Sequence, residues 1–464
     1  MFTRVQFAVM LLLIGAFARG QDQTEENLAA LAELDRAREI LEATETALGR
    51  DAMDLVEPLE QLARLLMAEN QFDDADNMLD RAIQITRYHN GLHTPAQLSL
   101  ITTRIDNFSN RQAWDDAREQ MDYLFAYYLR VPVTLNSNLL EQFIYLAEQH
   151  IRGATEDSEI EQGRHLSRVY QLNQAMITTA IELYGEDSPL TAPYFYRQAL
   201  HLYQVKKGHD AGGRDRTNSN LYYVLNGNSA GWSRLQYQRF CYEEGLQMLR
   251  RITEVFNELD PADPEGQAMS QLYLADWYML FDRAGMATEI YETVYDTLLA
   301  IGVDKDQVAS LFSQPRILPV PQFYPSVASA LAGLPATMTG TAAGSGTGAD
   351  NIAHQLSFVE WSADYPATRS ASSRFSRADD DSVTLRYSFE LPDENESTFL
   401  YKHRFRQTIG QAMEVQLLEG HRYIRGEDGD NNDRLEQLRF RPKMIDGKPV
   451  ASRNTLRYEM PASQ

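Results

Sequence analysis

Apolar residues recur at helical spacing from about Glu25 to Leu299. Over residues 59–66 they lie three or four positions apart, and the same spacing resumes at Phe72 after an Asn70-Gln71 turn. This spacing places the apolar side chains on one face of each helix, so the segment predicts paired helices. The positions expected to line these helices are Leu59, Leu62, Ala63, Phe72, Ala75, Leu79, Ala82, Trp114, Ala117 and Met121.

One short motif in this segment occurs twice. Phe72-Asp73-Asp74-Ala75 recurs 42 residues later as Trp114-Asp115-Asp116-Ala117. Repetition with a period between about 20 and 50 residues is typical of stacked helical repeats. A helical pair buries its apolar face only against neighbouring pairs, so we expect a solenoid of four or five pairs.

The connections between the predicted pairs also carry a pattern. Gly91-Leu92-His93-Thr94-Pro95 and Gly185-Glu186-Asp187-Ser188-Pro189 each end one helix and start the next. With the 42-residue period, the segment resembles tetratricopeptide repeats in the longer form found in kinesin light chains. The resemblance implies an α-solenoid that binds peptides or partner proteins in its groove, without cofactors or catalysis.

The first twenty residues have the composition of a targeting segment. Arg4 precedes an apolar run from Phe7 to Phe17, and Ala18-Arg19-Gly20 forms a small-x-small cleavage site. The run is too short to span a bilayer of about 30 Å comfortably and is typical of a secretory signal peptide. We expect a periplasmic or secreted bacterial protein; the alternative is an uncleaved segment that anchors the chain in the inner membrane.

Charge and cysteine content limit the classes of partner. Residues 1–350 contain 27 Lys and Arg against 48 Asp and Glu, whereas residues 351–464 are nearly balanced at 16 against 18. The acidic helical part would repel phosphate backbones, so we expect no nucleic-acid binding. It either attracts a basic partner or keeps an exported protein soluble. The single cysteine, Cys241, allows no disulfide within the chain and is expected in the core.

After Leu311 the composition changes. Four prolines punctuate 315–325, and residues 329–350 are almost all small, which predicts a flexible linker over 312–354. Strict alternation over 382–391 then predicts a half-buried strand. We expect a short helix over 409–418 and a closing hairpin between 438–442 and 450–458.

The closing residues carry a second resemblance. Arg439-Phe440-Arg441-Pro442 followed by Gly447-Lys448-Pro449-Val450 resembles the C-terminal domain of TonB-type energy transducers. The family's entry motif is echoed in 321–325. The resemblance implies a small α+β module that docks a partner, which includes the possibility of an outer-membrane protein. The motif positions are Phe440, Pro442, Gly447, Lys448, Pro449 and Val450.

Two motifs suggest chemistry, and each has a simpler explanation. Gly227-Asn228-Ser229-Ala230-Gly231 matches a nucleophile elbow, but the surrounding helices lack the parallel sheet that this elbow requires. Residues 428–433 begin like a calcium loop, but Asp433 and Arg439 occupy the positions of the required glycine and glutamate. Because the histidines show no zinc-binding spacing, we expect no metal, no cofactor and no enzyme, with a serine hydrolase at Ser229 as a minor alternative.

Together these features predict a mainly α protein. Its parts are a signal peptide (1–20), a TPR-like solenoid (21–311), a Pro/Gly/Ala-rich linker (312–354) and a small α+β antiparallel-sheet domain (355–464). The expected function is an exported scaffold for protein or peptide partners in the cell envelope; the alternative is a TonB-like transport accessory. Tyr123, Tyr127 and Tyr128 are the candidate partner-binding residues, because their spacing could line a groove.

Overall fold

The computed structural model divides into two compact units, Met1–Thr134 (the N-terminal unit) and Leu135–Gln464 (the C-terminal unit). The predicted signal peptide lies outside the residues whose structure is described. Among the described residues, no helix is both long and apolar enough to cross a membrane. The described ranges are 29–130, 136–211, 234–259, 261–333, 353–357, 382–392, 409–411, 413–419 and 438–461.

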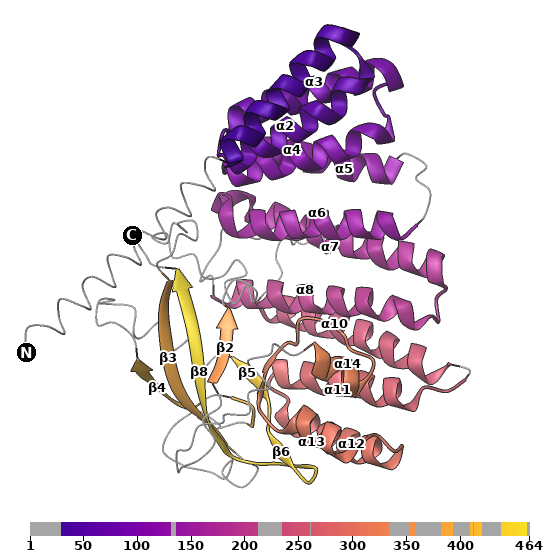
Figure 1. Ribbon diagram of the computed structural model, residues 1–464. Helices are drawn as coiled ribbons and strands as arrows, with labels where there is room; N and C mark the ends of the chain where they lie inside the picture. The colour runs from indigo at the N-terminus through magenta and orange to yellow at the C-terminus, as the bar shows by residue number, and fades with distance from the viewer. Residues whose placement is uncertain are drawn as a thin grey trace, which may run out of the picture. The chain divides into compact units, whose positions relative to one another are not determined.

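The N-terminal unit is a stack of helices (Figure 1). A helix over 29–48 comes first, and two helical pairs follow it. A 3-10 turn introduces each pair and ends where the first helix begins. The elements are η1 (Met53–Leu55), α2 (Val56–Ala68) and α3 (Phe72–Asn90), then η2 (Pro95–Gln97), α4 (Leu98–Asn110) and α5 (Trp114–Arg130).

The 42-residue period is confirmed element by element. The turn residues Asn70 and Gln112 both have left-handed φ angles, 59° and 61°. Gly49 and Gly91 end their helices with φ angles of 91° and 90°, in a region that favours glycine. Because Gly49 follows the helix over 29–48, that helix corresponds to the second helix of an earlier repeat. The sequence pattern did not reveal this half repeat.

The repeat positions predicted from the sequence form the core of this unit. Small side chains such as Ala63 and Ala75 are fully buried where neighbouring helices come close. All ten predicted positions are buried except Phe72, which is half-buried. The buried set is Leu59, Leu62, Ala63, Ala75, Leu79, Ala82, Trp114, Ala117 and Met121.

The C-terminal unit continues the helical architecture with three further pairs in its described residues. Side-chain caps start several helices: Asn136 accepts a hydrogen bond from the Leu139 amide at 3.0 Å, and Asp263 accepts one from Gly266 at 2.9 Å. The pairs are α6 (Ser137–Glu156) with α7 (Glu159–Tyr184), α8 (Ala192–Ala211) with α10 (Arg234–Asn257), and α11 (Pro264–Leu280) with α12 (Ala284–Ala300). The 3-10 turn η3 (Pro189–Thr191) precedes α8, and α13 (Lys305–Phe312) follows α12.

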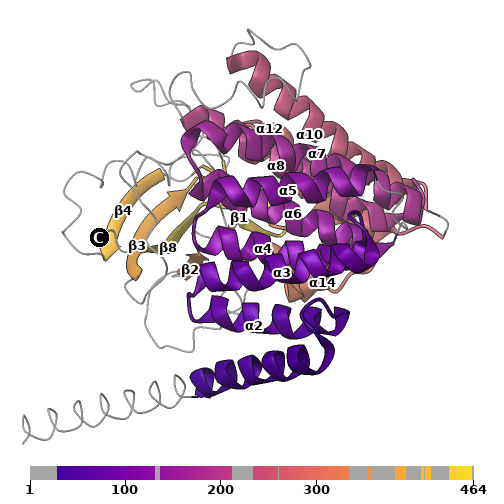
Figure 2. The same cartoon turned by 90° about the horizontal axis from the view of Figure 1, so that it is seen from above.

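The strands of this unit form one larger sheet and two small ladders. The larger sheet has the order β2-β8-β3-β4, and Figure 2 shows these strands from above. Its β8–β3 and β3–β4 pairs are antiparallel, whereas β2 adds to β8 in parallel. The strands are β1 (Arg316–Leu318), β2 (Ala353–Ser357), β3 (Ser382–Leu391), β4 (Met413–Glu419), β5 (Arg439–Arg441), β6 (Met444–Ile445), β7 (Lys448–Pro449) and β8 (Ser452–Pro461).

Three predictions for the C-terminal region need comparison with this topology. The strand over 382–391 is confirmed as β3. The helix expected over 409–418 is wrong, because residues 413–419 form β4, where they pair with β3. The closing hairpin is also wrong: β5 pairs with β1, and β8 pairs with β3 and β2. The turn at 446–447 instead joins the short strands β6 and β7.

The predicted linker over 312–354 is wrong for residues 312–333. This stretch contains β1 and the short helix α14 (Val327–Ala332). Leu318, Val320 and Phe323 are buried in the same core as α11 and α12. The prolines that suggested an extended tether therefore shape a segment that packs on the helices. Residues 334–352 lie outside the described residues.

Candidate functional site

A recurring contact holds the connections between repeats. Each connection begins with a glycine at positive φ, and the carbonyl of the next residue needs a donor. Arg81 of α3 donates to the Arg50 carbonyl at 2.9 Å. At the equivalent position 42 residues later, the Tyr123 hydroxyl of α5 donates to the Leu92 carbonyl at 3.4 Å.

The C-terminal unit repeats this contact. Arg251 of α10 donates to the Glu186 carbonyl at 3.2 Å, and Glu186 follows Gly185. The same guanidinium binds the Asp187 carboxylate at 2.8 Å. The sequence analysis missed this contact, although the 42-residue spacing of Arg81 and Tyr123 was a usable signal. The second helix of a pair therefore caps the connection that precedes that pair.

The three candidate tyrosines lie on α5, and two of them, Tyr123 and Tyr127, contact the connection at 91–95. Tyr127 donates to the His93 carbonyl at 3.4 Å, and Tyr123 also accepts a hydrogen bond from Gln97 at 2.9 Å. Tyr127 and Tyr128 are buried, and burial raises the pKa of Tyr128 to about 12. These hydrogen bonds and this burial are typical of residues that hold the helices and the connection together. A role in partner binding stays a prediction, and of the three only Tyr123 is half-exposed.

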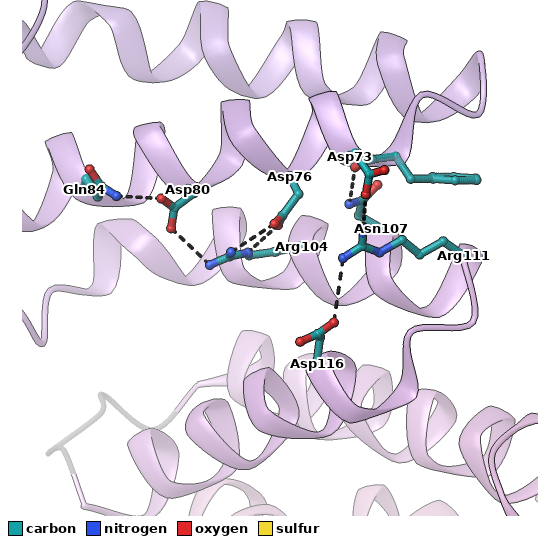
Figure 3. Close-up of polar contacts among 9 residues, drawn as sticks. Asp73, Asp76, Asp80, Gln84, Arg104, Asn107, Arg111 and Asp116 are labelled. Atoms are coloured by element: carbon teal, nitrogen blue, oxygen red, sulfur yellow. Dashed lines mark hydrogen bonds and ion pairs between the residues drawn. The ribbon is translucent and has the colours of Figure 1, made fainter.

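A charged ladder joins α3, α4 and α5 of the N-terminal unit (Figure 3). Arg104 binds Asp76 through two hydrogen bonds, Nε to Oδ1 at 2.6 Å and Nη2 to Oδ2 at 3.2 Å. Its Nη1 lies 3.4 Å from Asp80. Burial disfavours the charge of Arg104, but the hydrogen bond and attraction of Asp76 outweigh it and raise the pKa of Arg104. This bidentate pair links adjacent repeats.

About two turns further along, a second arginine, Arg111, continues the ladder (Figure 3). Arg111 contacts Asp73 and lies 3.7 Å from Asp116. The guanidinium groups of Arg104 and Arg111 both lie over the Phe108 ring, 5.3 and 4.9 Å from its centroid. Because carboxylates and an aromatic ring already engage both arginines, the ladder is a repeat-to-repeat contact. What it leaves at the surface is negative charge, since Asp73 is 91 % exposed.

The first helices of the N-terminal unit present a different, polar face. Arg64 of α2 donates to Glu60 at 2.7 Å and to Thr103 of α4 at 3.2 Å, so α2 and α4 are directly joined. The exposed residues on these two helices include Glu57, Gln61, Arg64, Ser99 and Asn110. We call these five residues the first-helix face.

In the C-terminal unit, two of the first helices, α8 and α11, hold part of the same chain. Tyr196 of α8 donates to the Val320 carbonyl at 2.5 Å, and Tyr273 of α11 donates to the Gln322 carbonyl at 3.1 Å. Glu265 of α11 accepts a hydrogen bond from the Val327 amide at 2.7 Å. Almost every residue of α11 from Gly266 to Leu280 is buried. The face that was expected to receive a partner at this end of the array is therefore covered by residues 320–327.

The TonB-like motif residues pack against the same helices. Phe440 is buried, and its amide donates to the Gly410 carbonyl at 2.8 Å. Lys448 pairs with Glu292 of α12 at 2.6 Å, and Gly447 lies beside Tyr295. Pro442 and Pro449 are buried, and Val450 is half-buried. These contacts join the motif to α12 instead of placing it in a tethered module. The resemblance to energy transducers stays a prediction.

A buried chain of polar groups joins α6 and α7, and the sequence analysis did not identify it. The Nδ1 atoms of His150 and His165 lie 2.9 Å apart, and His165 Nε2 lies 3.0 Å from Asp157 Oδ2. Gly153 makes room for the His165 ring, since a Cβ there would lie 2.3 Å from it. Burial, and then the neighbouring His165, lowers the pKa of His150 well below its usual value. A hydrogen bond between the two rings requires a proton on one Nδ1 atom and none on the other.

The motifs that suggested chemistry have different outcomes. Ser229 and the calcium-like loop over 428–433 lie outside the described residues. Cys241 is buried beside Tyr237, as expected for a core thiol. In the described part of the chain, no three His, Cys, Asp or Glu side chains come together as a metal site.

Comparisons with known proteins identify no family for this chain. No protein-family description matches it, and no curated protein matches it by sequence. Among solved structures, BtubC (BKLC) from P. vanneervenii is similar at 15 % sequence identity with a TM-score of 0.31. The match covers 60 % of this chain and 91 % of that protein. It adds no residue or activity to the site.

Proposed function

We propose that this protein is an exported scaffold that binds a peptide or partner protein of the cell envelope on the first-helix face of α2 and α4. The observation that supports the proposal is the contrast between two sets of first helices. In the C-terminal unit, residues 320–327 contact the first helices α8 and α11, whereas α2 and α4 of the N-terminal unit keep exposed polar side chains. Repeat arrays characteristically bind along such extended faces.

The chemistry of this face favours a polar partner segment. The exposed carboxylate of Glu57 and the amide of Gln61 offer hydrogen-bond acceptors and donors, and Arg64 is held in place by Glu60 and Thr103. Neighbouring Asp73 adds negative charge at the edge of the same unit. Such a surface selects a partner segment with lysine or arginine side chains. Export rests on the apolar run and cleavage site within residues 1–20.

The test is proximity labelling in the native cell envelope with the full chain. A variant that carries Glu57→Arg, Gln61→Arg and Ser99→Arg removes the carboxylate of the first-helix face and makes this face strongly positive. The matched control carries Asn77→Arg and Glu119→Arg, which are exposed on the second helices α3 and α5. We expect the first variant to lose the labelled partner and the control to keep it. Retention by both, or loss by both, would contradict the proposal.

A further inference from the structure

The β1–β5 ladder brings two arginines to one place in the core of the C-terminal unit. Arg316 and Arg441 are directly opposite partners in this antiparallel pair. Side chains of directly opposite residues lie on the same face of a ladder, about 5 Å apart at Cβ. Two positive charges in that arrangement repel each other unless negative charge lies between or beside them.

In the part of the chain that the structure describes, a carboxylate forms an ion pair with only one of these two guanidinium groups, that of Arg441. Asp276 accepts from Arg441 Nε at 3.0 Å and from Nη2 at 2.6 Å, and it also accepts from the Tyr291 hydroxyl at 2.8 Å. Among the described residues, Arg316 has neither a hydrogen bond nor an ion pair to a carboxylate. The local charge is therefore two guanidinium groups against one carboxylate.

The surroundings of Arg316 make this imbalance costly. Burial, and then the charge of Arg441, lowers the pKa of Arg316 to about 10. The neighbouring Tyr273 hydroxyl already donates to the Gln322 carbonyl and accepts from the Tyr324 amide. The side chain is nevertheless only half-buried, so solvent reaches it. A partly dehydrated guanidinium that solvent still reaches can be stabilised by an external anion.

We propose that Arg316 anchors a binding site for the carboxylate group of a ligand. One carboxylate would balance the one unpaired charge, as Asp276 does for Arg441. The planar fork of the guanidinium matches a carboxylate through two parallel hydrogen bonds. The carboxylate comes either from a small organic acid or from the end of a peptide. This site is independent of the first-helix face, because it lies in the other unit.

The test measures the melting temperature of the full chain against carboxylate concentration, with sodium chloride at equal ionic strength as the reference. The probes are acetate, N-acetylglycine as a mimic of a peptide end, and N-acetylglycinamide, which lacks the carboxylate. Arg316→Gln removes the anchor. Arg439→Gln is the matched control, because Arg439 lies on the partner strand β5 of the same ladder but pairs with the exposed Asp282 at 2.7 Å.

We expect acetate and N-acetylglycine to raise the melting temperature of the unaltered chain and of Arg439→Gln, with loss of the rise in Arg316→Gln. Tighter binding of N-acetylglycine than of acetate identifies a peptide end, and equal binding identifies a free acid. N-acetylglycinamide should have no effect. A rise no larger than that with chloride, or a rise that persists in Arg316→Gln, would overturn the proposal.

A second measurement covers the possibility that the variant changes folding. Removal of an unpaired, half-buried charge should leave the melting temperature in chloride unchanged or higher in Arg316→Gln. Arg441→Gln, which leaves Asp276 unpaired, should lower it. An equal decrease in both variants would show that Arg316 is a structural residue and would overturn the proposal.

Discussion

Arg441 and Asp276 lie 165 residues apart in the chain and form a bidentate ion pair in which each side chain is only 3 % exposed. Arg441 lies on β5, in the segment that resembles a separate C-terminal module. Asp276 lies on α11, the first helix of the last helical pair, so the ion pair joins this segment to the helices. A buried pair of this kind loses more stability when one partner is removed than when both are replaced by apolar groups. The loss of stability when one partner is removed therefore tests whether β5 belongs to the helical core.

Asp276→Ala should lower the free energy of unfolding of the C-terminal unit by about 3–5 kcal/mol, because it leaves Arg441 buried without a counter-charge. The double variant Asp276→Leu with Arg441→Met should lose much less. Urea denaturation followed by circular dichroism measures both values. Equal losses in the single and double variants would show that the pair is not buried as described.

Two glycines of the C-terminal unit, Gly245 in α10 and Gly285 in α12, should change stability in opposite directions when replaced by alanine. A Cβ at Gly245 of α10 would lie 2.1 Å from the Trp277 ring, whereas a Cβ at Gly285 of α12 would meet no atom within 4 Å. We expect Gly245→Ala to destabilise the protein by about 1–3 kcal/mol through overpacking. Gly285→Ala should stabilise it by about 0.4–1 kcal/mol. Thermal unfolding measures both, and the same sign for the two would contradict the packing of α10 on α11.

The repeat connections depend on backbone conformation as well as on the side-chain contacts of Arg81, Tyr123 and Arg251. Gly91 has φ 90° and ψ 164°, a region that is nearly exclusive to glycine, and a Cβ there would meet no atom within 4 Å. Gly91→Ala should therefore cost about 1–3 kcal/mol from backbone strain alone. Gln112→Gly, at a left-handed φ of 61°, should relieve strain and be neutral or stabilising. Urea denaturation distinguishes the two, and a neutral Gly91→Ala would contradict the assigned conformation.

The C-terminal unit should lose stability in mild acid because of His201. Burial lowers the pKa of His201 from 6.5 to about 3, although its Nε2 lies 3.1 Å from the Leu166 carbonyl. Below pH 6.5 the unfolded chain takes up a proton that the folded protein excludes. The contribution of this group is complete above pH 6.5 and is lost progressively as the pH falls toward 3, by about 2 kcal/mol at pH 5.

His201→Gln removes the titrating group and keeps a side-chain donor for the Leu166 carbonyl. The free energy of unfolding of this variant should fall less steeply between pH 6.5 and 5 than that of the unaltered chain. Buried His150 adds a loss in the same direction that the variant retains. An unchanged slope in His201→Gln would show that His201 is protonated in the folded protein.

The helical part of the fold was predictable because the signal is local and periodic. The spacing of Ala75 and Ala117, with the turns near Gly91 and Gly185, indicates stacked pairs without any knowledge of long-range contacts. The segment over 313–333 was not predictable, since small residues and prolines suit either a tether or a segment that is clamped by distant side chains. The hydrogen bonds from Tyr196 and Tyr273 to Val320 and Gln322 show that the segment is held against the helices. Nothing in the sequence indicates these pairings.

The same reasoning explains which polar contacts were missed. A buried Asp276 within an apolar helix is visible in the sequence, but its partner is 165 residues away. The TonB-like strand has the alternation of an ordinary edge strand, and only the Arg441 contact shows that one face is turned to α11. Local patterns indicate an element and its exposed or buried face, whereas the identity of the covering segment depends on tertiary contacts.

The central structural claim is that the segments over 316–332 and 439–441 form one cooperative core with α11, which leaves partner binding to the first-helix face. Hydrogen-exchange mass spectrometry in low urea tests it most directly. The account predicts that peptides from both segments exchange as slowly as those from α11, and that Asp276→Ala accelerates all three together. Rapid exchange of either segment while α11 stays protected would contradict the account and restore the tethered module.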